Sequence, residues 1–187
     1  PVAVSASNTG PYAAGQTVSI NSSPAGLAGY AWSGPSYTAS GQNQTIANAT
    51  SANSGVYTVV STDANGCTAS ANTTVSVYDG VVWTGAVSQD WNVAGNWNPN
   101  IVPNTCGVNV LIPTATANSP VVFAPVTVKN LDVNNNVSLT LLDNLIVCGN
   151  ATLGGVGTDI SGVGHLRFAG VGNQTLGGTG YVENLSV

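Results

Sequence analysis

Three tryptophans lie close together in the middle of the chain, in the stretch VVWTGAVSQDWNVAGNWNPNIVP. Trp83, Trp91 and Trp97 follow one another at short intervals. Exposed indole faces attract the apolar faces of pyranose rings, so the cluster suggests a sugar-stacking platform. The alternative is a cap, in which the rings cover the open end of a β-structure and block its unpaired backbone edge. A segment so rich in Gly and Asn favours the cap, and the burial of the rings decides between the two.

The charged side chains form no recognisable catalytic motif. A glycosidase needs two converging carboxylates, but each candidate stands alone in an expected turn or strand: Asp132, Asp143, Asp159 and Glu183. Lys129 and Arg167 are too sparse for a polysaccharide lyase. His165 is the only histidine, so a zinc site lacks ligands and a Ser-His-Asp triad lacks a supporting motif. We therefore predict that the chain is not an enzyme, and that these acids are solvated or capping.

Asp79-Gly80, at the expected domain junction, is the candidate site for a calcium ion. Asp63 or Asp90 and backbone carbonyls would have to converge there. A plain turn is the alternative, because Asp-Gly is a common turn pair. No other cofactor is expected.

The scarcity of charge excludes several classes of partner. Only 5% of the residues are charged, with two basic residues against seven acidic ones. Nucleic-acid binding and docking on an anionic membrane both need clustered Lys and Arg. Membrane insertion is also not expected, since no run of about 18 apolar residues occurs. A surface of Thr, Ser, Asn and Gln predicts an extracellular or bacterial cell-surface location.

The chain reads as two all-β domains, residues 1–78 and 79–187. In the first, Asp63-Ala64-Asn65-Gly66 suits a hairpin turn, because Asn and Gly tolerate positive φ. Short strands at this spacing predict a β-sandwich. The expected strands are Val2–Ser7, Gln16–Ser22, Gly29–Ser33, Gln44–Ala47, Gly55–Thr62 and Thr68–Val77.

The first domain resembles an immunoglobulin domain. Trp32 lies in the third strand, and the run N-S-G-V-Y-T-V resembles the D-x-G-x-Y-x-C motif. Tyr57 takes the tyrosine-corner position, while Val59 with Val18 or Ile20 fills the space of the usual inter-sheet disulfide. With YAWSGPS and the closing TTVSV, the segment is similar to the Ig-like and PKD-like repeats of large secreted proteins of the Bacteroidota.

The second domain repeats a short phrase, N-L-x-V. It occurs at Asn130–Val133, Asn144–Val147 and Asn184–Val187. Short strands with Asn-rich corners, such as Asn134-Asn135-Asn136, predict a parallel β-helix or related solenoid. The phrases are unevenly spaced, since the last lies much farther from the second than the second does from the first. A second β-sandwich or a jelly roll is therefore the alternative. The expected strands are Val108–Ile112, Val121–Val122, Val126–Val128, Leu131–Val133, Leu139–Leu142, Leu145–Val147, Leu166–Phe168 and Val182–Val187, with Leu153 in another.

The start of the second domain resembles a module of the same bacterial surface proteins. The matching residues are W-x-G from Trp83, the box W-x-x-x-G-N-W from Trp91 to Trp97, and Val102-Pro103. The resemblance implies a β-helical region that continues past Val187, and it implies no enzymatic activity.

The three cysteines leave one unpaired however they combine. We prefer a disulfide between Cys106 and Cys148, since both lie in the second domain beside apolar strand-like runs. Three buried thiols are the alternative. In the repeats that the first domain resembles, the cysteine of an N-G-C turn often forms a disulfide with a cysteine near the start of the domain. Alanines stand there in this chain, so Cys67 is expected to be unpaired.

These observations predict a non-enzymatic structural or adhesive segment of a large extracellular protein or filament. Its partners would be other surface proteins, glycans or copies of itself. The alternative function is a carbohydrate-binding accessory region of a secreted glycan-degrading enzyme.

Overall fold

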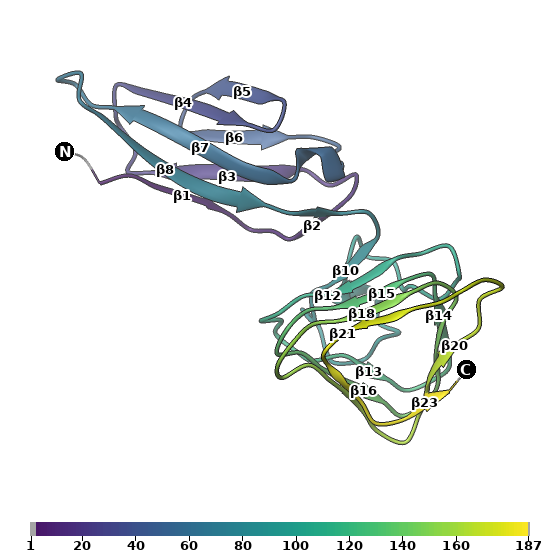
Figure 1. Cartoon of the computed structure of the whole chain (residues 1–187). Helices are drawn as coiled ribbons and strands as arrows, with labels where there is room; N and C mark the ends of the chain where they lie inside the picture. Colours follow the sequence, from purple (N-terminus) through teal and green to yellow (C-terminus); the bar gives the residue numbers. More distant parts are fainter. Residues whose placement is uncertain (1–2, 187) are drawn as a thin grey trace. The chain divides into compact units, whose positions relative to one another are not determined.

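The computed structural model describes residues 3–186, and all their regular structure is β-strand apart from two short 3-10 turns, η1 (Ser51–Asn53) and η2 (Ala94–Asn96). Val2 and Val187, at the outer ends of two expected strands, lie outside the described residues. The chain divides into two compact units, Pro1–Asp79 and Gly80–Val187, which we call unit 1 and unit 2 (Figure 1). No helix among the described residues is long and apolar enough to cross a membrane.

Unit 1 is an immunoglobulin-like β-sandwich. Its strands are β1 (Ser5–Asn8), β2 (Tyr12–Ala13), β3 (Val18–Ser23), β4 (Gly29–Gly34), β5 (Tyr37–Ser40), β6 (Asn43–Ile46), β7 (Gly55–Thr62), β8 (Thr68–Val75) and β9 (Val77–Tyr78). One antiparallel sheet has the order β1-β3-β6 and the other β5-β4-β7-β8, while β2 pairs in parallel with β9. The predicted sandwich is confirmed, although β2 and β5 were not expected.

The core of unit 1 contains the residues that carried the immunoglobulin resemblance. Trp32 on β4 and Tyr57 on β7 are buried, and the Tyr57 hydroxyl donates to the carbonyl oxygen of Asn53 at 3.0 Å. Val18, Ile20 and Val59 are also fully buried. The tyrosine corner is therefore present, and aliphatic side chains occupy the centre of the sandwich.

The predicted hairpin turn joins β7 to β8. The carboxylate of Asp63 accepts the backbone N–H groups of Asn65 at 2.8 Å and Cys67 at 2.9 Å. Gly66 adopts a φ of 82°, in the left-handed region that favours glycine. The turn sets a continuous register between the two strands, from Gly55 opposite Val75 to Thr62 opposite Thr68.

Unit 2 is a three-sided β-solenoid, as predicted, and not a second sandwich. Its strands are β10 (Val81–Trp83), β11 (Trp97–Asn98), β12 (Val110–Ile112), β13 (Val121–Val122), β14 (Val126–Val128), β15 (Leu131–Val133), β16 (Ser138–Leu141), β17 (Leu145–Val147), β18 (Ala151–Leu153), β19 (Asp159–Ser161), β20 (Leu166–Phe168), β21 (Leu176–Gly178), β22 (Tyr181–Val182) and β23 (Leu185–Ser186). They form three sheets with the orders β11-β10-β12-β15-β18-β21, β13-β16-β19-β22 and β14-β17-β20-β23. Every pairing is parallel except that of β10 with β11, so the chain winds through four coils from β12 to β23.

The solenoid explains the irregular spacing of the N-L-x-V phrase. Leu131 and Leu145 lie on different faces of the same coil, so the first two phrases are close in sequence. Leu145 pairs with Leu166 and Leu166 with Leu185, so the longer interval corresponds to two coils along one face. The phrase therefore marks an Asn corner followed by a strand, and it is not a unit of one coil.

The Asn-rich corners bond along the stack, as expected. The side chain of Asn130 donates to the side chain of Asn109 at 3.0 Å and accepts the backbone N–H of Asn150 at 2.7 Å. At another corner Asn136 has a φ of 56°, and Asn135 accepts the N–H of Gly155 from the next coil. These bonds satisfy backbone groups that the turns would otherwise leave unpaired.

Candidate functional site

The three tryptophans form one cluster at the first coil of unit 2. Trp83 ends β10, Trp97 begins β11, and Trp91 lies in the segment between these strands. The Trp97 ring makes edge contacts with both others, with centroids 4.9 Å from Trp83 and 4.7 Å from Trp91. Their exposed fractions are 0% for Trp83, 0% for Trp91 and 1% for Trp97.

Each indole N–H has a backbone acceptor. Trp83 donates to the carbonyl oxygen of Asn118 at 2.8 Å, Trp91 to that of Pro103 at 3.1 Å, and Trp97 to that of Trp91 at 2.8 Å. The bonds to Asn118 and Pro103 tie the covering segment, residues 81–98, to the chain that follows it, while the bond from Trp97 to Trp91 lies within the segment. Since a buried indole N–H needs an acceptor, they also fix the orientation of each ring.

Asn96 holds the covering segment together. Its side chain is fully buried and accepts the backbone N–H groups of Val87 at 2.9 Å and Ser88 at 2.8 Å. The same amide donates to the carbonyl oxygen of Asp90 at 2.7 Å. The geometry of the W-x-x-x-G-N-W box thus depends on Asn96. An apolar residue at this position would leave the N–H groups of Val87 and Ser88 and the carbonyl oxygen of Asp90 without these bonds.

The sugar-stacking interpretation of Trp83, Trp91 and Trp97 is therefore wrong for this structure. Stacking needs an exposed ring face, and none of the three rings has one. The cluster is a cap: it belongs to the same hydrophobic core as Val110, Leu131 and the other inward residues of the coils. The physical reason is that the first coil has no coil before it to cover its apolar interior.

The cysteines lie where the sequence analysis preferred them. Cys106 and Cys148 form a disulfide across 42 residues of sequence, with their Cα atoms 5.5 Å apart. Cys148 follows β17, and its N–H donates to the carbonyl oxygen of Val128 in the coil before. Cys67 is a free, exposed thiol in the hairpin of unit 1.

Three of the carboxylates that we considered for catalysis or metal binding accept backbone N–H groups. Asp143 accepts the N–H of Asn144 at 2.7 Å, and Glu183 accepts the N–H of Gly162 at 2.9 Å. Asp90 accepts the N–H of Asn92 at 2.9 Å. Within residues 3–186, no group of three or more His, Cys, Asp or Glu side chains comes together in a way that could hold a metal ion.

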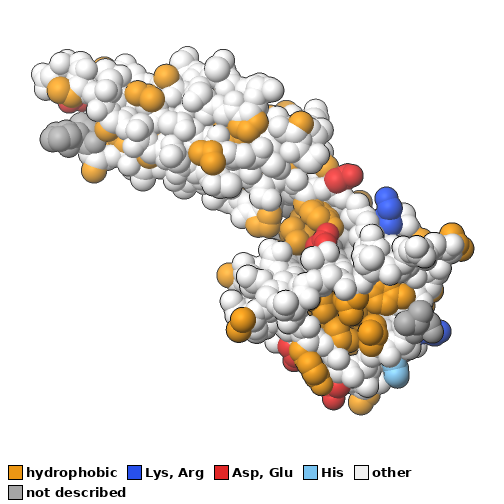
Figure 2. Space-filling view, in the orientation of Figure 1, with side chains coloured by type: hydrophobic (Ala, Val, Ile, Leu, Met, Phe, Trp, Pro, Cys, Tyr) orange, Lys and Arg blue, Asp and Glu red, His pale blue; other side chains and the backbone are white. Residues whose placement is uncertain are grey.

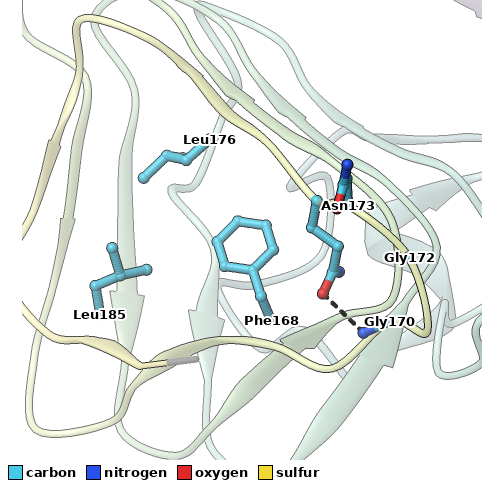
Figure 3. Close-up of a pocket in the computed structure, with 7 residues that line it drawn as sticks. Phe168, Gly170, Gly172, Asn173, Leu176 and Leu185 are labelled. Atoms are coloured by element: carbon cyan, nitrogen blue, oxygen red, sulfur yellow. Dashed lines mark hydrogen bonds between the residues drawn. The ribbon is translucent and has the colours of Figure 1, made fainter.

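A hollow that the sequence did not indicate lies at the last coil of unit 2. It has a volume of about 650 Å³, and Phe168, Leu176 and Leu185 provide its apolar side (Figure 3). Gln174 stiffens the rim, since its side chain accepts the N–H of Gly170 and donates to the carbonyl oxygens of Val147 and Gly149, each at 2.8 Å. The hollow is the uncovered interior of the solenoid, and its rim is the long loop before β21.

The fold and the buried cap define the class: an all-β protein with an immunoglobulin-like sandwich followed by a capped β-solenoid. A family model described as "Domain of unknown function (DUF8693)" matches residues 82–153. That segment contains all three cap tryptophans and both cysteines of the disulfide.

Comparisons of the whole chain give only distant similarity. No curated protein matches it. It is similar to the crystal structure of murine CEACAM1b, with 20% identity and a TM-score of 0.35 over 43% of this chain and 56% of that one. It is also similar to the three N-terminal domains of the highly immunogenic outer capsid protein (Hoc) of bacteriophage RB49, with 20% identity and a TM-score of 0.31 over 42% of this chain and 30% of that one. The chain thus spans less than two thirds of either protein.

Proposed function

We propose that the chain is a non-enzymatic structural and adhesive segment of a large extracellular surface protein or filament. One observation supports this most directly: the three tryptophans, which are the side chains best suited to bind sugars, instead close one end of a stack of coils. The second unit thus uses its largest aromatic side chains to stabilise the solenoid. A solenoid capped at its first coil suits a stalk or a display surface.

The outer faces of the solenoid support an adhesive role. Hydroxyl side chains occupy several outward positions of the strands, as at Thr127, Thr140, Thr152 and Ser161, where they alternate along the columns with apolar and charged residues such as Ile146, Asp132 and Arg167. These hydroxyl groups provide hydrogen-bonding groups for other surface proteins or glycans. The partners that we propose are accordingly surface proteins, glycans or copies of this chain, and not nucleic acids or the membrane interior.

An extracellular location agrees with the chemistry of the chain. Disulfides such as Cys106–Cys148 persist in oxidising compartments and are rare in the cytosol. The low content of Lys and Arg leaves few sites for trypsin-like proteases. The resemblance of both units to modules of Bacteroidota surface proteins points in the same direction, and we propose a parent protein of that kind.

The proposal is tested by measuring adhesion and turnover on the same surfaces. Beads coated with the purified chain should be retained on cell-surface material, while the chain length of added polysaccharides stays unchanged. Beads coated with a Trp97→Ala variant, which should lose the solenoid, are the control. Release of reducing ends above the level of a protein-free blank would contradict the proposal.

The same assay addresses the carbohydrate-binding alternative. An accessory region of a glycan-degrading enzyme should bind one class of polysaccharide and not protein surfaces. Since the cap rings are buried, such binding would have to use another part of the surface. Retention that is abolished by one soluble glycan would favour that alternative.

A further inference from the structure

The hairpin between β7 and β8 holds an asparagine and a glycine in an open position. Asn65 and Gly66 are both exposed at its tip, and a Cβ atom on Gly66 would meet nothing within 4 Å outside its chain neighbours. The backbone N–H of Asn65 donates to Asp63, but its side-chain amide has no hydrogen-bond partner among residues 3–186. The amide is therefore free to turn toward the backbone nitrogen of Gly66.

The comparable pairs of the chain are held in place. Asn65-Gly66 is the only Asn-Gly pair, and the three Asn-Ser pairs begin at Asn21, Asn53 and Asn118. Asn21 lies in β3, paired with β1 on one side and β6 on the other. The side chain of Asn53 accepts a backbone N–H at 2.9 Å, and that of Asn118 donates to a backbone carbonyl oxygen at 2.7 Å. Of these four pairs, only Asn65-Gly66 combines a free amide with an unhindered following residue.

We infer that Asn65 is a site of spontaneous deamidation, a reaction to which asparagine is prone. The backbone nitrogen of Gly66 loses its proton to hydroxide and attacks the side-chain carbonyl carbon of Asn65. A C–N bond forms, and the side-chain nitrogen takes a proton from water and leaves as ammonia, so the hydroxide is regenerated. The product is a succinimide ring.

A water molecule then opens the ring at one of its two C–N bonds. Breaking the bond to the former side-chain carbonyl gives aspartate. Breaking the bond to the main-chain carbonyl gives isoaspartate, in which the main chain runs through the former side chain. Either way, the net change at Asn65 is the replacement of NH2 by OH.

The turn slows this reaction, because it engages the attacking nitrogen. The N–H of Gly66 donates to the carbonyl oxygen of Asp63 at 3.0 Å. The Asp63 carboxylate accepts the N–H groups of Asn65 and Cys67, which fixes the backbone on both sides of Gly66. The reaction therefore proceeds when the tip opens. Such openings cost little free energy, since residues 64–67 are all exposed.

Deamidation changes both the charge and the geometry of the tip. Asp63 and Asp79 are the only charged side chains of unit 1, whose visible face in Figure 2 is almost free of charged groups. A new carboxylate at residue 65 repels that of Asp63, which holds the turn. Isoaspartate also lengthens the main chain by a methylene group. Both changes weaken the turn that sets the register of β7 and β8, beside the free thiol of Cys67.

The test is a time course of the folded full chain at neutral and mildly alkaline pH. After reduction, alkylation and denaturation, chymotrypsin cuts after Tyr, Phe and Trp and releases Asn65 within residues 58–78, with each Asn-Ser pair in a different segment. Mass spectrometry should show the amide lost from Asn65 well before Asn53 or Asn118. The rate should rise with pH, because the attacking nitrogen must lose its proton. Reversed-phase chromatography should resolve two products of equal mass, aspartate and isoaspartate.

Three variants separate the roles of the residues. Asn65→Gln keeps an exposed amide but would have to close a larger ring, so residues 58–78 should keep their mass. Asp63→Ala removes the carboxylate that holds the turn and should speed the reaction about tenfold, as expected for the loss of hydrogen bonds to a charged group. Asp79→Ala removes the other acid of unit 1 and should leave the rate unchanged. Circular dichroism verifies that the variants are folded.

Loss of the amide from Asn65 no faster than from Asn53 and Asn118 would overturn the inference. So would an equal mass gain of residues 58–78 in Asn65→Gln, since the reaction would then lie at another residue. An unchanged rate in Asp63→Ala would overturn the protective role of the turn. The inference does not rest on the proposed function, and none of these outcomes changes the adhesion assay.

Discussion

Trp97 is the residue on which the cap depends most. Its ring contacts both other indoles, and its N–H bonds the Trp91 carbonyl oxygen. We expect Trp97→Ala to lower the free energy of unfolding of unit 2 by about 3–5 kcal/mol, as for other large-to-small changes in a core. Trp97→Phe keeps part of the ring and should cost clearly less. Urea denaturation followed by circular dichroism measures both.

The same substitution distinguishes a cap from a binding platform. A platform residue can be removed with the fold intact, whereas a cap residue cannot. Unchanged stability of Trp97→Ala together with lost glycan binding would contradict the assignment of the cluster as a cap. Trp32, in the core of unit 1, gives an internal reference signal for the other unit.

Tyr57 links the stability of unit 1 to alkaline pH. Burial raises its pKa, the nearby charge of Tyr37 raises it further, and a hydrogen bond with Asn53 opposes the rise. The folded state therefore holds the phenolic proton more tightly than the unfolded state does. The resulting stabilisation is complete below the ordinary tyrosine pKa of about 10 and is lost as the pH rises through the folded value.

We therefore expect unit 1 to lose stability above about pH 10. Tyr57→Phe should reduce this alkaline loss, because the phenylalanine has no proton to release. At neutral pH the variant should be less stable by about 1 kcal/mol, the usual worth of one hydrogen bond. Urea midpoints across the alkaline range measure both effects, and a variant with the full alkaline loss would rule out Tyr57 as its source.

At the scale of elements, the disulfide joins the loop before the first coil to the corner after β17. It closes 42 residues of sequence, so by loop-closure entropy it should stabilise unit 2 by about 2–4 kcal/mol. The double variant Cys106→Ala/Cys148→Ala should lower the unfolding temperature of unit 2 and leave that of unit 1 unchanged. Calorimetry separates the transitions. An equal shift in both would show that the bond is not the cause.

Strand positions were the part of the fold that the sequence predicted best. Val121–Val122, Val126–Val128, Leu131–Val133 and Leu145–Val147 match β13, β14, β15 and β17 residue for residue. These segments alternate apolar and polar side chains or are wholly apolar, and that is the signal of a buried strand. The strands β19 and β21 were missed, because D-I-S and L-G-G carry too few apolar residues for such a signal. The strands β10 and β11 were also missed, and the single strand expected from Val182 is two strands, β22 and β23, with a bend at Glu183 and Asn184 between them.

The end structures of unit 2 were harder to predict. The tryptophan spacing located the cap, but the same residues also fitted a sugar platform, since burial depends on which segment folds over them. The hollow by Phe168 could not be predicted, because it depends on how the long loop before β21 folds beside the last described strands. Its one signal was the length of the last coil: Ala151 and its register partner Leu176 lie farther apart in sequence than Leu131 and Ala151 do.

At the scale of the whole molecule, trypsin should report on unit 2 alone. The two basic residues of the chain, Lys129 and Arg167, both lie there. Arg167 is in β20, which pairs with β23, the last described strand of its sheet. Lys129 is in a corner beside the disulfide, with coils on both sides. Local opening costs least where fewest contacts must break, which is the uncovered end.

We therefore expect the native chain to resist trypsin and then to be cut first after Arg167, although this residue lies in a strand and Lys129 in a turn. Mass spectrometry of a time course should show the segment 168–187 released before any product of cleavage after Lys129. Initial cleavage after Lys129 would contradict this expectation. It would show that the corner beside the disulfide opens more easily than β20 does.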